Sequence, residues 1–296
     1  SRSLITEAVR GEGAHLVDRN GHRFMTEYHD MAELAPRDIV SRAILAQMAK
    51  TNFTHVFLDA RHLGRERFMQ RFPAIFQLLK KFDIDPGKDL IPIHPSAHYM
   101  VGGVHTDESA LTSIKGLYAC GEVASAGLHG ANRLASDSLL EGLVFGKIAG
   151  ENCRESVEAG SRTPAKIVSD IRPSDRSELD LGDVRSSLRS VMWRQVGIER
   201  TGDRLAEVAE MFDFWASYTL DKIFDDRAGW EVQNILLLGA LMTRAARWRS
   251  ESRGTHYRLD HPQPLDLYRV HDVWQRGVGE PVTLPVRTGV AHTAAK

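Results

Sequence analysis

Cysteine is scarce in this sequence, since Cys120 and Cys153 are the only two among 296 residues. Two cysteines cannot build a disulfide framework, and these two have few potential metal ligands near them, so a reducing cytoplasm is the expected compartment. Long apolar runs are also missing. None reaches the roughly 18 residues that a membrane-spanning helix needs, and the first residues lack the apolar segment of a signal peptide.

An excess of charge of one sign is missing as well. The 38 Lys and Arg residues nearly balance the 39 Asp and Glu residues, which leaves a formal net charge of -1. No overall field therefore attracts nucleic acid or an anionic membrane, and neither is an expected partner. Hydrophobic residues make up 42% of the chain, enough for a globular protein of one large or two to three small domains. Any anion site must be local.

Residues 1–99 combine strand and helix signals and predict an α+β unit. Asn20-Gly21 lies between two short β-like runs and indicates a hairpin. Three longer elements are expected: a helix at 37–50, a strand at 55–60 and a helix over 62–82. In the last of these, the apolar side chains are spaced for one buried face: Phe68, Phe72, Ile75, Phe76 and Leu79.

Residues 100–155 follow the order strand, loop, helix. The run GLYACGEV at 116–123 predicts a short strand, and a glycine-rich loop leads to a helix from about Ser136 to Cys153. A polar linker is expected at 156–180. The chain beyond it predicts a small helical bundle, with helices at 182–196, 202–218 and 229–250, the last apolar nearly all round.

The stretch HGANRLASDSLLEG at 129–142 places cationic and flexible residues just before a helix start. The free N–H groups of such a helix end can hold an anion or an electron-rich ring edge. Arg133 adds a two-pronged donor suited to a carboxylate, and His129 could assist or simply pack. The alternative is an ordinary helix with Ser136 as its N-cap and Arg133 in solvent.

Six separated stretches resemble, in order along nearly the whole chain, the flavoprotein family of succinate dehydrogenase and fumarate reductase. They are TEAVRGEGAHLVDRNGHRFM at 6–25, AELAPRD at 32–38, HYMVGGVHTD at 98–107, GLYACGEV at 116–123, HGANRLASDSLLEGLVFG at 129–146 and ESRGTHYRLDHP at 251–262. Within the family, AELAPRD and ASDSLLE are most similar to the aspartate-oxidising branch, because the respiratory dehydrogenases more usually read GANSLLD.

The resemblance implies FAD-dependent oxidation of L-aspartate to iminoaspartate, a step of quinolinate and NAD biosynthesis. Hydride would pass to flavin N5, with oxygen or fumarate as the acceptor. The expected substrates are dicarboxylates, L-aspartate and fumarate. Two alternatives remain: a succinate dehydrogenase or fumarate reductase flavoprotein subunit, and a non-catalytic fragment that binds a partner such as quinolinate synthase.

The same resemblance assigns binding roles. Glu122 matches the acid that holds the ribitol hydroxyls of FAD, while Ser138 and the backbone of Leu139 would face flavin N1 and O2. His98 and Arg133 match a pair that grips one substrate carboxylate, and Thr6 matches a contact to the other carboxylate.

Catalytic roles fall on Arg37, Glu7 and Arg10. Arg37 matches the residue usually assigned proton transfer at the substrate carbon, and a guanidinium is a poor base, so the role requires a relay. Glu7 and Arg10 match the neighbouring acid and base, at a helical i, i+3 spacing. The alternative for Arg37 is a helix-start residue paired with Asp38 or Glu33.

The family's opening strand, G-x-G-x-x-G turn and helix have no counterpart, since Gly11 and Gly13 precede a strand-like run. The resemblance thus implies mixed α/β and α+β architecture. The expected domains are a capping domain at 1–99 that is incomplete at its N-terminus, the C-terminal segment of an FAD-binding domain at 100–155, and a three-helix bundle with a tail at 181–296. The isolated chain is expected to bind FAD weakly and to be inactive.

Three features favour other interpretations only weakly. His94 and His98 are four apart, but Pro92 and Pro95 interrupt any helix that would join them, so no metal site is expected. The arginine-rich stretch at 243–253 is expected to be a solvated helix end, diluted by Glu251, not a nucleic-acid patch. Asp137 stands where the family usually has Asn, and its charge would oppose flavin reduction.

Overall fold

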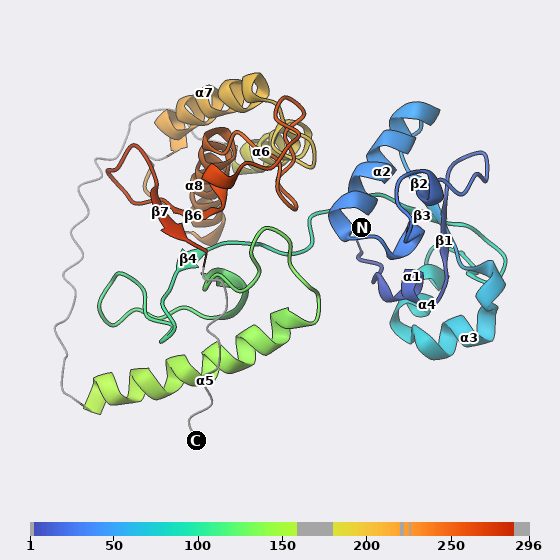
Figure 1. Ribbon diagram of the computed structural model, residues 1–296, viewed down its shortest axis with the longest axis horizontal. Helices are drawn as coiled ribbons and strands as arrows, with labels where there is room; N and C mark the ends of the chain where they lie inside the picture. Colours follow the sequence, from blue (N-terminus) through green and yellow to red (C-terminus); the bar gives the residue numbers. More distant parts are fainter. Residues whose placement is uncertain (1–2, 159–179, 220–221, 225, 287–296) are drawn as a thin grey trace. The chain divides into compact units, whose positions relative to one another are not determined.

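The computed structural model describes residues 3–158, 180–219, 222–224 and 226–286. The chain divides into two compact units, Ser1–Tyr99 and Met100–Lys296, and each is described here by itself (Figure 1). The described residues include no helix that is long and apolar enough to cross a membrane.

The first unit is built on a three-stranded antiparallel sheet in the order β1-β2-β3. Its strands are β1 (His15–Val17), β2 (Val56–Asp59) and β3 (Ile91–Ile93), with Leu16 opposite Leu58 and Leu58 opposite Ile91. The helices are α1 (Ala8–Gly11), α2 (Arg37–Thr51), α3 (Arg65–Arg71) and α4 (Pro73–Lys80), with short 3-10 turns η1 (Met25–Glu27), η2 (Ala32–Leu34) and η3 (Arg61–Leu63). The expected helix at 37–50 and strand at 55–60 are confirmed.

The single helix expected over 62–82 is wrong in one respect, because the structure breaks it at Phe72. Pro73 has no N–H to continue a helix, and it instead occupies the first turn of α4, where a proline is tolerated. The apolar face survives the break, since Phe68, Phe76 and Leu79 are buried with Phe72 in the core of the unit. The two short helices thus cover the sheet with one continuous apolar surface.

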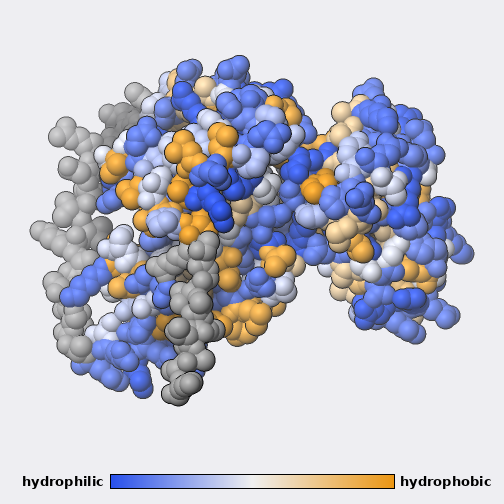
Figure 2. Space-filling model, viewed as in Figure 1, coloured by the Kyte–Doolittle hydropathy of each residue, from blue (hydrophilic) through white to orange (hydrophobic). Residues whose placement is uncertain are grey.

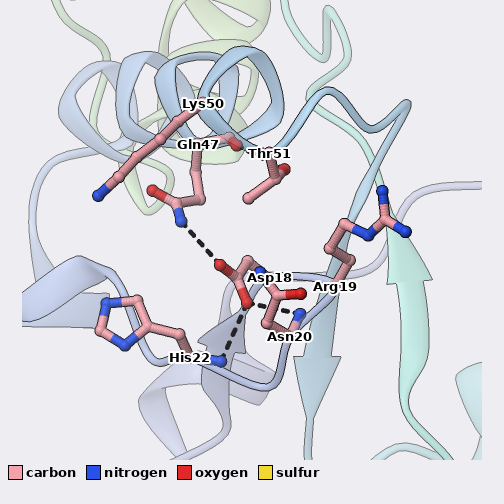
Figure 3. Close-up of a pocket in the computed structure, with 7 residues that line it drawn as sticks. All are labelled: Asp18, Arg19, Asn20, His22, Gln47, Lys50 and Thr51. Atoms are coloured by element: carbon pink, nitrogen blue, oxygen red, sulfur yellow. Dashed lines mark hydrogen bonds between the residues drawn. The ribbon is translucent and has the colours of Figure 1, made fainter.

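At Asn20-Gly21 the structure has a turn, but the two strands expected of a hairpin are reduced to a single bridge. The Asp18 N–H donates to the His22 carbonyl oxygen, and Gly21 has a φ of 81°, a conformation that favours glycine. Only Val17 and Arg23 form a bridge beyond the turn. The buried Asp18 carboxylate fixes the turn by accepting the N–H groups of Asn20 and His22 and the side-chain amide of Gln47 (Figure 3).

The second unit begins with a parallel pair of strands, β4 (Val104–His105) and β5 (Ala124–Ser125). The strand expected at 116–123 is wrong: only Tyr118 forms a bridge there, with Leu111, and Gly121–Val123 is the 3-10 turn η4. Gly121 has a φ of 72°, which ends an extended run. Helix α5 (Asp137–Glu158) then runs along one edge of the unit and contacts η4 (Figure 1).

Three helices form the expected bundle: α6 (Leu181–Gln195), α7 (Gly202–Thr219) and α8 (Arg227–Trp248). Aspartates cap two of them, since the side chain of Asp180 accepts the Asp183 N–H and that of Asp226 accepts the Gly229 N–H. The shared core contains Leu188, Val196, Leu205, Val208, Phe212, Leu236 and Ala246. Most of the linker expected at 156–180 lies outside the described residues, and 156–158 belong to α5.

An antiparallel hairpin follows the bundle, where no strand was expected. It pairs β6 (Val270–Val273) with β7 (Val282–Pro285), after the 3-10 turn η5 (Asp266–Tyr268). Its alternation is short and interrupted by His271 and Asp272, so the sequence gives little signal of strand structure.

The arginine-rich stretch at 243–253 is a solvated helix end only in part: Arg244 and Arg247 are exposed in the last turns of α8, whereas the segment after Trp248 packs into the protein. Glu251 has no exposed surface, and it binds Arg249 at 2.9 Å and Arg253 at 2.8 Å. Arg249 reaches a second carboxylate, Asp272 of β6, at 2.8 Å. Burial alone would raise the pKa of Glu251, but hydrogen bonds from Arg253, the Leu265 N–H and Arg249 outweigh it and lower that pKa. Arg249 and Arg253 are therefore engaged within the protein, and the prediction is wrong for this part of the stretch.

His256 joins this network as a neutral side chain. One ring nitrogen lies 2.7 Å from the Arg200 guanidinium and the other lies 2.9 Å from the Arg249 carbonyl oxygen. Burial, followed by the positive charge of Arg200, lowers the pKa of His256 to about 4. The free energy of unfolding should therefore depend on pH below neutrality.

In the unfolded chain His256 regains its ordinary pKa, so the unfolded state binds the additional proton as the pH falls from about 6.5 towards 4. The free energy of unfolding is therefore highest above this pH window, and it decreases as the pH falls through the window, by about 2 kcal/mol between pH 7 and pH 5. Urea unfolding at the two pH values measures the loss, which His256→Gln should reduce. His105→Gln, at an exposed histidine of β4, is the control. If both variants reduce the pH-dependent loss of stability equally, the prediction is contradicted.

Candidate functional site

The predicted site residues are divided between the two units. Thr6, Glu7, Arg10, Arg37 and His98 belong to the first unit, while Glu122, Arg133, Ser138 and Leu139 belong to the second. Each group is described within its own unit. The contact expected between His98 and Arg133 would join the two units and stays a prediction.

In the first unit, a carboxylate lies between two guanidinium groups. Arg37 is the first residue of α2, and its Nε donates to Oε2 of Glu7 at 2.5 Å, although 30 residues separate them. Arg10 approaches the same oxygen at 3.5 Å from one turn along α1. The short sequence TEAVR therefore places Glu7 and Arg10 together, and tertiary packing brings Arg37 to them.

The alternative partners of Arg37 are both engaged elsewhere. Asp38 accepts a hydrogen bond from Arg42 at 3.0 Å, one turn later in α2. Glu33 is buried and accepts two hydrogen bonds from Arg23, at 3.0 and 2.6 Å. The structure thus pairs Arg37 with Glu7 rather than with a neighbour in sequence.

Arg10 is the more deeply placed of the two arginines. Its Nη1 donates to the backbone carbonyl oxygen of Glu33, and its side chain is 14% exposed against 33% for Arg37. Burial lowers the pKa of Arg10, Glu7 raises it, and Arg37 lowers it again. A half-exposed carboxylate between one fixed and one accessible guanidinium can pass a proton without moving far.

Thr6 and His98 have open side chains. Thr6 is exposed directly before α1, and its Oγ1 accepts the Ala8 N–H at 3.3 Å. His98 is exposed in the irregular segment after β3. Both can therefore donate to a ligand that approaches from solvent, which agrees with the contact roles that the resemblance implies.

The sequence suggested Glu33 only as a possible partner of Arg37 and did not predict its role in fixing the backbone near Arg10. Its carboxylate also accepts the Leu16 N–H at 3.1 Å, which ties the η2 turn to β1. Burial would raise the pKa of Glu33, but the hydrogen bonds from Arg23 and Leu16 outweigh it and lower that pKa. Glu33 thereby fixes the backbone carbonyl that holds Arg10. The sequence signal was the acid within AELAPRD, a segment otherwise apolar before the helix.

In the second unit, Arg133 turns towards the start of α5. Its Nε donates to Oγ of Ser138 at 2.7 Å. The helix begins at Asp137, and the Ser136 hydroxyl donates to the Asp137 carboxylate at 3.0 Å, so the N-cap interaction considered for Ser136 is not the one seen. Arg133 and the first turn of α5 thus form one donor-rich group, as the sequence predicted.

His129 packs beneath this loop. Its Nε2 lies 2.8 Å from Oε2 of Glu141, and the two side chains are only 8% and 2% exposed. Of the two possibilities left open for His129, the structure favours the supporting one. A buried pair between the loop and α5 fixes the approach of Arg133 to Ser138.

Glu122 lies in η4, directly against the helix. Its carboxylate accepts the Met100 N–H at 3.0 Å and the residue is otherwise exposed. Gly121 faces α5, since a Cβ on it would lie in ordinary contact with the Gly142 Cα, at 3.6 Å. The acid is therefore held beside the first turns of α5, from a 3-10 turn and not from the predicted strand.

Apolar side chains surround the start of α5. Leu139 is 81% exposed and Leu143 is 71% exposed, and four neighbours are exposed as well: Leu134, Leu140, Val144 and Val123. Figure 2 shows hydrophobic residues gathered at the edge of this unit where α5 begins. An apolar surface of this kind, next to N–H donors and an arginine, is typical of a binding surface.

The hollow drawn in Figure 3 lies elsewhere in the first unit. Its lining residues are Asp18, Arg19, Asn20, His22, Gln47, Lys50 and Thr51, and none of the predicted site residues belongs to it. Among the described residues, no group of three or more His, Cys, Asp or Glu side chains could hold a metal ion.

Two family descriptions match the chain. Residues 1–139 match the FAD binding domain, and residues 185–291 match the C-terminal domain of the fumarate reductase flavoprotein. The first matched segment includes every predicted site residue. The second includes the helical bundle from residue 185 onwards and the hairpin that follows it.

Curated relatives agree with these matches. L-aspartate oxidase of Streptomyces coelicolor is 40% identical over 301 residues, covering 98% of this chain and 51% of that protein. L-aspartate oxidase of Acinetobacter baylyi is 40% identical over 270 residues, covering 88% of this chain and 49% of that protein. The chain thus spans about half the length of the curated relatives it matches.

Solved structures show the same likeness. A quinol-fumarate reductase with menaquinol molecules superimposes with a TM-score of 0.82 at 29% identity, covering 98% of this chain and 57% of that chain. The Mycobacterium smegmatis protein Sdh1 in complex with UQ1 superimposes with a TM-score of 0.73 at 28% identity, covering 97% and 52%. The mixed α/β fold expected from the sequence is therefore confirmed.

Proposed function

The chain belongs to the flavoprotein family of succinate dehydrogenase and fumarate reductase, and we propose that its residues serve an FAD-dependent enzyme that oxidises L-aspartate to iminoaspartate. The observation that carries the proposal is the Arg37–Glu7–Arg10 cluster, formed by residues to which the family resemblance assigns proton transfer. The identity of about 40% to L-aspartate oxidases supports L-aspartate as the substrate.

The second unit carries residues that would hold part of FAD. Ser138 and Leu139 lie in the first turn of a 22-residue helix, whose free N–H groups favour negative charge on a bound ring. The exposed apolar side chains around this turn suit the faces of the ring system. The Glu122 carboxylate can accept hydrogen bonds from sugar-like hydroxyls. Bound FAD would supply a hydride acceptor, and the protein would supply position and charge.

Arg133, His98 and Thr6 would hold the dicarboxylate. Arg133 presents a planar guanidinium that matches a carboxylate in two parallel hydrogen bonds, and Ser138 keeps its Nε side oriented. His98 and Thr6 are exposed and can donate to the two ends of the substrate. Two clamped carboxylates fix the carbon between them, so that reaction requires little further loss of freedom.

Glu7 would move the proton. As Arg37 takes a proton from the substrate side, the carboxylate 2.5 Å from its Nε can accept one in turn. Arg10, fixed on the Glu33 carbonyl oxygen, stabilises Glu7 as a carboxylate and keeps it facing Arg37. The cluster thus offers the relay that a guanidinium, a poor base by itself, would need.

The full-length protein loaded with FAD should consume oxygen with L-aspartate and form hydrogen peroxide. Succinate at the same concentration should give less than about one tenth of that rate, since the site must reject a substrate without the amino group. An oxygen electrode measures both rates. Turnover of succinate with a quinone and none of aspartate would contradict the proposal and favour the second candidate, a respiratory flavoprotein subunit, to which the structural likeness also points.

Two finer assignments rest on this function. We infer a cytoplasmic enzyme whose product passes to a quinolinate synthase, because iminoaspartate hydrolyses readily in water and benefits from a nearby consumer. Co-purification of the two full-length proteins at physiological salt tests the partnership, and separate elution of both contradicts it.

A further inference from the structure

A turn of the C-terminal half contacts the loop that carries Arg133. Arg253 and His256 close the turn with two backbone hydrogen bonds, at 2.8 and 3.1 Å, and leave Gly254 and Thr255 at its tip. Thr255 then donates twice to one acceptor, the Ala131 carbonyl oxygen: its N–H at 2.9 Å and its hydroxyl at 3.2 Å. The acceptor lies two residues before Arg133.

Gly254 lets the turn come this close. Its φ is 58°, and a Cβ built on it would lie 2.2 Å from the Ala131 oxygen and 2.6 Å from the Ala131 carbonyl carbon. No side chain fits in that space, so glycine is required both for its conformation and for the approach. The C-terminal segment therefore supports the loop at the Ala131 carbonyl group.

The turn is rigidly based. Arg253 donates to both oxygens of the fully buried Glu251, at 2.8 and 2.9 Å. On the other side of the turn, the nearly buried Arg258 donates twice to Asp260, at 2.8 and 2.7 Å. His256, at the end of the turn, is held by Arg200. Each of these two ion pairs has one member with almost no exposed surface and is formed by two parallel hydrogen bonds, which fixes the geometry of the turn.

We propose that Thr255 and Gly254 are positioning residues that set the backbone of the Ala131–Arg133 segment and thereby aim the Arg133 guanidinium. This assignment rests on the proposed function, in which Arg133 grips a carboxylate. The turn touches neither substrate nor cofactor in this account. The turn acts on Arg133 through the Ala131 carbonyl group. The hydroxyl of Thr255 and the absence of a Cβ at Gly254 can therefore be tested by separate substitutions.

Thr255→Val removes the hydroxyl donor and keeps the side-chain shape, whereas Thr255→Ser keeps the donor. In the full-length holoenzyme, Thr255→Val should raise the KM for L-aspartate about 2- to 10-fold with little change in kcat, because a carboxylate clamp acts on substrate and transition state alike. Thr255→Ser should restore the KM. Gly254→Ala should raise it by about 10- to 100-fold, since the loop must shift. Thr283→Val, at an exposed threonine of β7, is the matched control.

Hydrogen exchange on the chain itself gives a second readout that needs no cofactor. Amides of residues 131–138 should exchange faster in Thr255→Val and Gly254→Ala, and at the original rate in Thr255→Ser and Thr283→Val. Unchanged exchange, or faster exchange with an unchanged KM, overturns the proposal. If the original holoenzyme lacks aspartate turnover but binds fumarate, the dissociation constant for fumarate takes the place of KM. If it does neither, the proposed function fails, and with it the assignment to Arg133.

Discussion

Arg37→Gln is expected to slow reduction of the flavin by L-aspartate about 10²- to 10⁴-fold in the full-length holoenzyme, the range typical of a lost proton-transfer group. Glutamine keeps an N–H donor in the place of the Arg37 Nε, which lies 2.5 Å from Oε2 of Glu7. It has no positive charge, and it cannot pass a proton from the substrate to the Glu7 carboxylate. Stopped-flow absorbance in the absence of oxygen measures the rate directly. The substrate dissociation constant should change much less than the rate.

Arg42→Gln is the matched control, because Arg42 lies in the same helix and also pairs with a carboxylate, Asp38 at 3.0 Å. Its effect on the rate should stay within about twofold. Equal losses in the two variants would mean that α2 requires its surface ion pairs for folding only. A slow Arg37→Gln reaction with normal flavin spectrum and stability separates chemistry from folding.

The largest effect on stability is expected at Glu251, where Glu251→Gln should lower the free energy of unfolding by about 3–5 kcal/mol. The fully buried carboxylate accepts hydrogen bonds from Arg249, from Nε and Nη2 of Arg253 and from the Leu265 N–H. An amide removes the negative charge that the two partly buried guanidinium groups share and turns an N–H group towards donors. Urea unfolding followed by tryptophan fluorescence measures the loss, because Trp248 and Trp274 flank this network.

Glu210→Gln provides the comparison, since Glu210 is exposed on α7. A surface substitution of this kind should change the free energy of unfolding by less than about 0.5 kcal/mol. Losses of similar size at Glu210 and Glu251 would show that the network contributes no more than exposed charges do. A large loss at Glu251 alone, together with faster exchange at residues 131–138, would also link the network to the loop of Arg133.

Much of the site could be predicted from local sequence. The i, i+3 spacing of Glu7 and Arg10 predicts that they share one face of a helical turn, and in the structure the Arg10 guanidinium lies 3.5 Å from a carboxylate oxygen of Glu7. The ordered motifs gave the family, and the loop before α5 gave the donor group of Arg133 and Ser138. These features depend on a few neighbouring residues, so a short stretch of sequence is enough to specify them.

Tertiary packing decided the rest. The partner of Arg37 is a glutamate 30 residues away rather than the acids beside it, and Arg249 pairs with the fully buried Glu251 rather than with solvent. From sequence alone a charged side chain is predicted to be exposed, because burial of a charge is costly without a partner of opposite charge. For Arg37, a distant segment of the chain supplies that partner. The approach of Gly254 to Ala131 has the same origin. Local spacing thus determined which chemical groups the protein carries, and long-range packing determined which of them meet.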